Sequence, residues 1–193
     1  MLRFVVSMNI YHRWMCGSRG WTKVMHGEYL PGVLRGIELG GDVLEVGPGP
    51  GVATDWLRTR VARLTSIEID HKLAESLKKR MAGTNVTVIE GDATSMQLAD
   101  ASFDTVLSFA MLHHVPSQLQ DQLLAEACRV LRPGGAFAGM DSTPNFRWNL
   151  YHLFDDRYPV DPATFAARLE SAGFAHARVL VADSGFSWRV RKG

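Results

Sequence analysis

The chain has 193 residues, of which 46% are apolar and 21% are charged, as is typical of one globular domain with a substantial core. Its 21 basic and 20 acidic residues leave a formal net charge of +1, so no positive excess points to a nucleic-acid partner. Two cysteines cannot build a disulfide framework. These values favour a cytoplasmic protein that handles small ligands.

The first residues predict neither a leader peptide nor a membrane span. Ser7 and Asn9 interrupt the short apolar run at the start, and no run in the chain approaches the roughly 20 apolar residues of a spanning helix. Met8 is a candidate biological start, because MNIYHR reads as a natural N-terminus. Residues 1–39 are irregular in pattern, and we expect a helical lid segment there, ahead of a ligand-binding domain over 40–193 within a single-domain protein.

From Asp42 the pattern becomes regular. Short apolar runs predict strands over residues 42–46, 63–69, 85–90, 102–109 and 135–141. Intervening segments predict helices over 52–61, 71–81 and 117–131, the last ended by Pro133 and Gly134. After an irregular stretch over 142–160, a helix over 162–172 and two strands over 176–183 and 185–192 complete the chain.

Strands that alternate with helices predict a parallel sheet with helical crossovers. The last two strands are joined only by a short turn at Ser184-Gly185, which requires antiparallel neighbours. We therefore expect an α/β fold: a three-layer sandwich around a mostly parallel, seven-stranded sheet with one antiparallel strand near its edge.

The segment VLEVGPGPG places Gly47, Gly49 and Gly51 between the first strand and the following helix. In open α/β sheets, ligands bind at such strand ends. A dinucleotide-binding loop would need glycine at position 52, where this chain has Val52, so the loop fits nicotinamide dinucleotides poorly. A tight turn with no ligand is the remaining structural alternative.

Taken together in chain order, these motifs resemble the class I S-adenosylmethionine (SAM)-dependent methyltransferases. The matching segments are ExGxGxG at 45–51, an acid at Glu68, GDA at 91–93, FDTVLSFAMLHHV at 103–115, RVLRPGG at 129–135 and ESAGF at 170–174. The resemblance covers about residues 30–192 and implies a Rossmann-like fold with SAM as cofactor. SAM is cationic and has no phosphate, so carboxylates and main-chain dipoles suit its site better than Lys or Arg does.

The resemblance also implies roles for individual residues. The adenosine part would be held by Glu68 at the ribose hydroxyls, Asp92 at the adenine amino group, the Ala93 N–H at a ring nitrogen and Ile69 at the adenine face. The methionine part would lie over the glycine loop of Gly47, Gly49 and Gly51, with Glu45 and the Phe109 carbonyl near its amino group.

Each acid also has a structural interpretation. Asp70 is expected to be the N-cap of the helix that follows it, not a ligand. Glu68 could be a simple charge at a strand end, and Asp92 could cap a turn.

His113 and His114 follow the fourth strand, near the expected position of the methyl group. His113 is the candidate general base or acceptor contact, although a His pair here could equally serve packing or hydrogen bonding. No cluster of His, Cys and carboxylate residues has metal-ligand spacing in the sequence, so we expect no metal.

The two irregular segments are candidates for enclosing the acceptor. Their aromatic and histidine residues, with His114, suggest a site for an apolar or aromatic molecule, while ordinary packing would explain any one of them equally well. The candidate acceptor residues are Tyr11, Trp14, Trp21, His114, Trp148 and Tyr151, with His12, His152 and Phe154 nearby in sequence.

The sequence thus favours methyl transfer from SAM to O, N or C of a small molecule by in-line displacement. SFAM after the fourth strand lacks the Asn- or Asp-Pro-Pro-aromatic turn of amino methyltransferases for DNA bases. The alternatives are an inactive SAM-binding protein, a methyltransferase for RNA or protein and, last, a nicotinamide oxidoreductase. The acceptor and the oligomeric state stay open.

Overall fold

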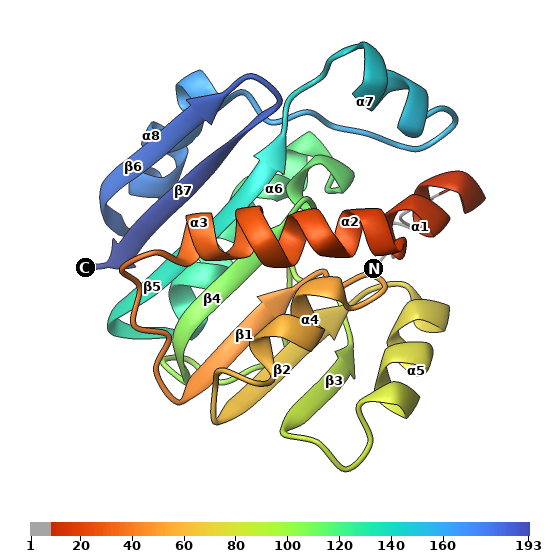
Figure 1. Cartoon of the computed structure of the whole chain (residues 1–193). Helices are drawn as coiled ribbons and strands as arrows, with labels where there is room; N and C mark the ends of the chain where they lie inside the picture. The colour runs from red at the N-terminus through yellow and green to blue at the C-terminus, as the bar shows by residue number, and fades with distance from the viewer. Residues whose placement is uncertain (1–8) are drawn as a thin grey trace.

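A seven-stranded sheet runs through the protein in the order β3-β2-β1-β4-β5-β7-β6 (Figure 1). The computed structural model describes residues 9–193, so Met8 and the first eight positions of the expected lid segment lie outside it. The strands are β1 Asp42–Val46, β2 Arg63–Glu68, β3 Val86–Glu90, β4 Phe103–Phe109, β5 Leu131–Ser142, β6 Phe174–Ala182 and β7 Gly185–Lys192.

Every strand pair from β3 to β5 is parallel, and β7 is inserted antiparallel between β5 and β6. This confirms the expected mostly parallel, Rossmann-like sheet with one antiparallel strand near its edge. The chain order reverses between β1 and β4, which lie side by side although β2 and β3 come between them in sequence. Such a switch point leaves a crevice at the carboxyl ends of the strands.

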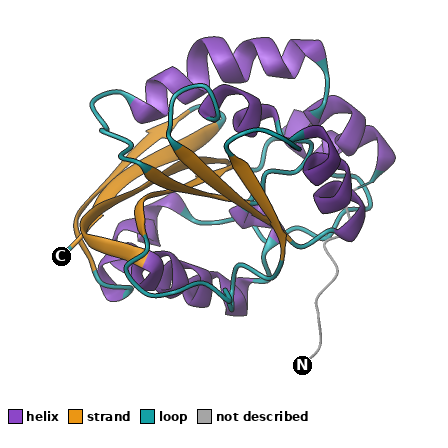
Figure 2. Cartoon of the chain, turned by 90° about the horizontal axis from the view of Figure 1, so that it is seen from below, coloured by secondary structure: helices purple, strands orange, loops and turns teal. Residues whose placement is uncertain are grey.

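Helices cover both faces of the sheet (Figure 2). They are α1 Ile10–Cys16, α2 Arg19–Val24, the π-helical η1 Met25–Tyr29, α3 Leu30–Leu34, α4 Val52–Leu57, α5 His71–Arg80, the 3₁₀ turn η2 Leu112–His114, α6 Ser117–Val130, α7 Phe146–Tyr151 and α8 Pro162–Ser171. Within the described part of the chain, none of these helices has the length and apolar character needed to cross a membrane.

Two apolar clusters explain why the strands are buried on both faces. In β1, Leu44 and Val46 belong to a cluster with residues of α6 and α8, whereas Val43 belongs to a second cluster with residues of η1, α3 and α4. Successive side chains of a strand point to opposite faces, so each short apolar run serves both clusters.

Several element bounds differ from those expected. The helix expected over 52–61 ends at Leu57, and β5 begins at Leu131 instead of 135, so that Pro133 and Gly134 lie within the strand. In this part of β5, the pairing with β4 shifts register between Phe103 and Thr105, which accommodates the proline as a strand irregularity. The irregular stretch over 142–160 contains α7.

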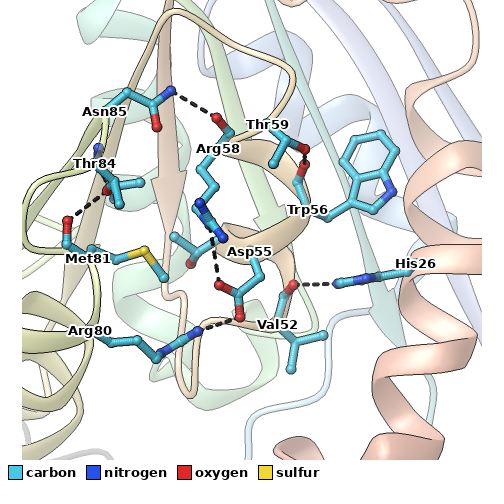
Figure 3. A network of polar contacts seen from close by, with 12 residues as sticks. His26, Val52, Asp55, Trp56, Arg58, Thr59, Arg80, Met81, Thr84 and Asn85 are labelled. Carbon is cyan, nitrogen blue, oxygen red and sulfur yellow. Dashed lines mark hydrogen bonds and ion pairs between the residues drawn. The ribbon is translucent and has the colours of Figure 1, made fainter.

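The short helix α4, which follows the glycine loop, is held by polar contacts from both sides (Figure 3). His26 Nε2 of η1 donates to the Val52 carbonyl (2.8 Å), and Arg80 of α5 forms an ion pair with Asp55. Arg80 Nη2 also donates to the Pro50 carbonyl (2.7 Å) within the loop. These contacts fix the glycine loop against α5.

Candidate functional site

A cavity opens at the carboxyl ends of β1, β2, β3 and β4, with about 1060 Å³ of empty space that includes open solvent. It is lined by all the expected cofactor residues except Gly51, namely Glu45, Gly47, Gly49, Glu68, Ile69, Asp92, Ala93 and Phe109. Gly51 lies instead at the start of α4, as its N-cap. The topology therefore brings residues from four separate strand ends to one place.

The glycine loop needs its glycines for steric reasons. Gly47 has φ 67°, and a Cβ there would collide with the Met111 side chain. Gly49 also has positive φ, but no atom lies within 4 Å of the position its Cβ would take, because this side of the loop faces the cavity. Its main chain can therefore approach a ligand closely.

Glu68 ties the end of β2 to the glycine loop. Its Oε2 accepts the Gly49 N–H (2.9 Å), and its Oε1 accepts the Asp70 N–H (2.9 Å). Burial raises the pKa of Glu68, and the main-chain donors oppose that rise. The carboxylate thus lies at the cavity wall, between the loop and the first turn of α5.

Glu45 is fully buried on β1 and only half satisfied. Its Oε2 accepts the hydroxyls of Thr54 (2.6 Å) and Ser66 (2.8 Å), whereas its Oε1 has no hydrogen-bond partner among the described residues. Burial raises the pKa of this carboxyl to about 7. A buried acid with an unpartnered oxygen beside a cavity suits a cationic ligand or a bridging water.

The other acids behave as structural caps, as the alternative interpretations expected. Asp70 is the N-cap of α5 and accepts the N–H groups of Lys72 and Leu73. Asp92 Oδ1 accepts the N–H (2.8 Å) and hydroxyl (2.7 Å) of Thr94, so it caps a turn and lines the cavity at the same time.

Comparison with known proteins places this arrangement in a family. Residues 44–139 match the family model described as "Methyltransferase domain". The chain carries a class I SAM-dependent methyltransferase domain. This confirms the expected family and, for this domain, SAM as the cofactor.

Two relatives illustrate the match to the methyltransferases. A probable SAM-dependent methyltransferase of Mycolicibacterium smegmatis is 35% identical over 106 residues, 55% of this chain and 39% of that protein. The phthiotriol/phenolphthiotriol dimycocerosates methyltransferase of Mycobacterium tuberculosis is 36% identical over 112 residues, 56% of this chain and 41% of that protein. The matched part is thus about two fifths of either relative.

The fold of the methyltransferase domain is also found in a solved structure. A SAM-dependent methyltransferase from Aquifex aeolicus superposes with a TM-score of 0.70 at 20% identity, covering 89% of this chain and 93% of that one. At this identity the likeness concerns the fold alone.

The expected acceptor residues of the methyltransferase divide into two groups. Trp21 and His114 line the cavity, whereas Tyr11, Trp14, Trp148 and Tyr151 do not. Tyr11 and Tyr151 stack on each other (ring centroids 6.0 Å), so they join α1 to α7. The structure thus places α1 and α7 together beside the cavity mouth, as Cys16 at the end of α1 is part of the cavity wall.

His113, the candidate base, does not line the cavity. Its ring is buried, with Nδ1 2.5 Å from Asp141 Oδ1 and Nε2 3.0 Å from His152 Nε2. Both ring nitrogens are therefore engaged outside the cavity. His114, the next residue, faces the cavity instead.

Sequence reasoning missed several residues of the wall, among them Cys16, Met25 and Met111. Ala110 lines the cavity directly after β4 with φ 51°, a left-handed conformation that costs a non-glycine residue about 1–3 kcal/mol. No motif marks this strain, which follows from the sharp turn that the chain makes between β4 and η2.

Proposed function

We propose that this protein transfers the methyl group of SAM to an O, N or C atom of a small apolar acceptor. The observation that carries the proposal is the charge of the cavity wall: Glu45, Glu68 and Asp92 line it, and no described Lys or Arg does. SAM brings a sulfonium and an ammonium group and no phosphate, so this wall complements it. A wall for a dinucleotide would need donors for the pyrophosphate.

In this proposal the adenosine part of SAM lies over Ile69, with Glu68 accepting from the ribose hydroxyls. Asp92 accepts from the adenine amino group, and the Ala93 N–H donates to the adenine ring. The glycine loop passes under the methionine part, where the free oxygen of Glu45 stabilises the ammonium group, directly or through water. The Phe109 carbonyl faces the same group.

The proposal of an apolar acceptor rests on the exposed side chains of the elements beside the cavity mouth. Apolar side chains of α1, α7 and the loop after α7 are unusually exposed: Trp14 by 68%, Phe146 by 83% and Phe154 by 89%. Exposed apolar side chains gathered on neighbouring elements are typical of binding surfaces. We propose that they receive an apolar acceptor, whose nucleophilic atom then enters beside His114. The free thiols Cys16 and Cys128 suit a cytoplasmic location.

The chemistry requires mainly positioning. The acceptor lone pair forms the new bond to the methyl carbon while the carbon–sulfur bond breaks and its electron pair returns to sulfur, giving neutral S-adenosylhomocysteine. His113 is a positioning residue in this scheme, because its ring contacts Asp141 and His152 and does not reach the cavity.

The test is turnover with methyl-labelled SAM and a panel of phenols, long-chain alcohols and apolar amines, with S-adenosylhomocysteine as the measured product. We expect label in at least one apolar acceptor. Label found only in added RNA or protein would favour a macromolecular methyltransferase. SAM binding without any product across all classes would favour the inactive SAM-binding protein.

A further inference from the structure

Three buried histidines that are distant in sequence converge beside the cavity. His12 of α1, His114 of η2 and His152 after α7 are 4%, 6% and 4% exposed, and one ring nitrogen from each lies within 4.8 Å of the others. We propose that these three residues bind a divalent transition-metal ion, with Zn²⁺ as the ion that best fits the ligands. The sequence led us to expect no metal, because these ligands come from three separate segments and have no metal-ligand spacing.

Two of the three ligands are already oriented as metal ligands are. His12 Nδ1 donates to Asp155 Oδ2 (2.7 Å), and His152 Nδ1 donates to the Trp148 carbonyl (2.8 Å). Each acceptor requires hydrogen on Nδ1, so the lone pair of each neutral ring is on Nε2. A second-shell carboxylate or carbonyl that fixes the tautomer in this way accompanies most metal-binding histidines.

A fourth histidine, His113, contacts the cluster through His152. His113 Nδ1 faces Asp141, whose carboxylate also accepts the N–H groups of His113 (3.0 Å) and Ser142 (2.7 Å), so Nδ1 must carry hydrogen. With Nδ1 of both rings donating, the Nε2 atoms of His113 and His152 face each other across 3.0 Å. Either a hydrogen on one of these two atoms or a cation beside them would make this contact favourable.

His114 provides an independent observation. Both of its ring nitrogens are buried and have no hydrogen-bond partner among the described residues. The main chain of Asp156 lies near the ring but outside hydrogen-bond geometry. A buried imidazole without partners is costly, and a metal bond would satisfy it.

The donor set indicates the metal and the kind of site. Imidazole ligands suit Zn²⁺ and its neighbours among the transition metals. With zinc–nitrogen bonds of about 2.0–2.1 Å, tetrahedral ligands lie about 3.4 Å apart, which small ring rotations can reach from the present separations. Three histidines with a fourth position left open are typical of catalytic zinc sites, whereas structural sites are closed by four protein ligands.

His114 belongs both to the cluster and to the cavity wall, so an ion held by His12, His114 and His152 would lie next to the cavity. This consequence rests on the proposed function: such an ion would supply Lewis acidity that lowers the pKa of an acceptor hydroxyl within its reach. The metal site itself does not depend on that role.

The first experiment measures metal content in full-length protein prepared without a polyhistidine tag. The protein is stripped with a chelator, loaded with ZnCl₂, dialysed and analysed by mass spectrometry, with affinity measured by competition against a chromogenic chelator. We expect about one zinc per chain. His12→Ala and His152→Ala should weaken binding by at least about 100-fold, and Asp155→Asn, which removes a second-shell charge, by about 10–100-fold.

The matched control is His71→Ala, because His71 is an exposed histidine that also pairs with a carboxylate, Glu90, but lies outside the cluster. It should retain the wild-type affinity. An unaltered stoichiometry and affinity in folded His12→Ala and His152→Ala would overturn the proposal, as would failure of the wild-type protein to retain zinc.

A second measurement needs no variant. X-ray absorption at the zinc edge of the loaded wild-type protein should show at least three imidazole nitrogens, and an oxygen-only shell would contradict the site. Thermal unfolding with SAM separates the two proposals: zinc retention without a SAM effect removes the proposed function alone, and a SAM effect without zinc retention removes the metal site alone.

Discussion

At the residue scale, Glu68 and Glu90 offer a direct comparison. They are register partners at the ends of β2 and β3, yet only Glu68 lines the cavity. If Glu68 accepts from the ribose, Glu68→Ala should weaken SAM binding by about 1.5–3 kcal/mol, the range for hydrogen bonds to a charged group. Calorimetric titration measures this, with Glu90→Ala as a control of unchanged affinity. Equal affinities for both folded variants would remove Glu68 from the site.

Glu45 connects the site to the pH dependence of stability. Its pKa rises from 4.5 to about 7 on folding, so the folded chain keeps a proton that the unfolded chain loses. Ionisation of Glu45 therefore lowers the free energy of unfolding as pH increases through the window from about 4.5 to 7. Glu45→Gln resembles the protonated carboxyl at every pH.

Between pH 5 and pH 8, the wild type should lose roughly 2–3 kcal/mol relative to Glu45→Gln. Urea unfolding of both proteins at several pH values tests this, and Glu75→Gln, at a half-buried surface position outside the cavity, serves as the control. Parallel pH profiles for the wild type and Glu45→Gln would show that the carboxyl is not held in the buried, half-satisfied environment described above.

At the scale of elements, the junction between the glycine loop and α4 is under steric constraint. Gly51 has φ 83°, and a Cβ there would lie 2.5 Å from the buried Leu77 Cδ1 and would also collide with Arg80. Gly83 has a similar φ of 77°, but no atom lies within 4 Å of its Cβ position. Alanine at either position would have to adopt a left-handed backbone conformation, which destabilises the protein by about 1–2 kcal/mol.

Gly51→Ala should therefore be less stable than Gly83→Ala by about 1–3 kcal/mol, the cost of overpacking. Chemical denaturation of both variants gives the difference, and it should be accompanied by weaker SAM binding in Gly51→Ala alone. If the two variants are equally stable, then Leu77 and Arg80 of α5 do not pack against the loop at Gly51 as described.

Elements with clear periodicity were predicted well. The runs at 42–46 and 185–192 coincide with β1 and β7, because continuous burial in β1 and alternating burial in β7 each leave a signal in the sequence itself. The short helix α7 escaped prediction because Phe146 and Leu150 are exposed, so that its buried Trp148 gives no helical periodicity.

At the scale of the whole molecule, strand order decided how much of the site was predictable. A parallel sheet places the carboxyl ends of its strands at one edge, so Glu45, Glu68 and Asp92 could be assigned to one cavity from their positions after strands. His12, His114 and His152 follow no such rule. Their proximity depends on how α1 and α7 pack together, which neither spacing nor periodicity encodes.

Binding of SAM in the cavity is tested most directly by thermal unfolding of the protein with SAM, S-adenosylhomocysteine, NAD and NADP. A ligand at about 100 times its Kd adds about 2.7 kcal/mol of stability, which for a chain of this size raises Tm by roughly 5–11 °C. We predict this increase with SAM and S-adenosylhomocysteine and none with the dinucleotides. No increase with SAM, or an increase with NAD alone, would contradict the account.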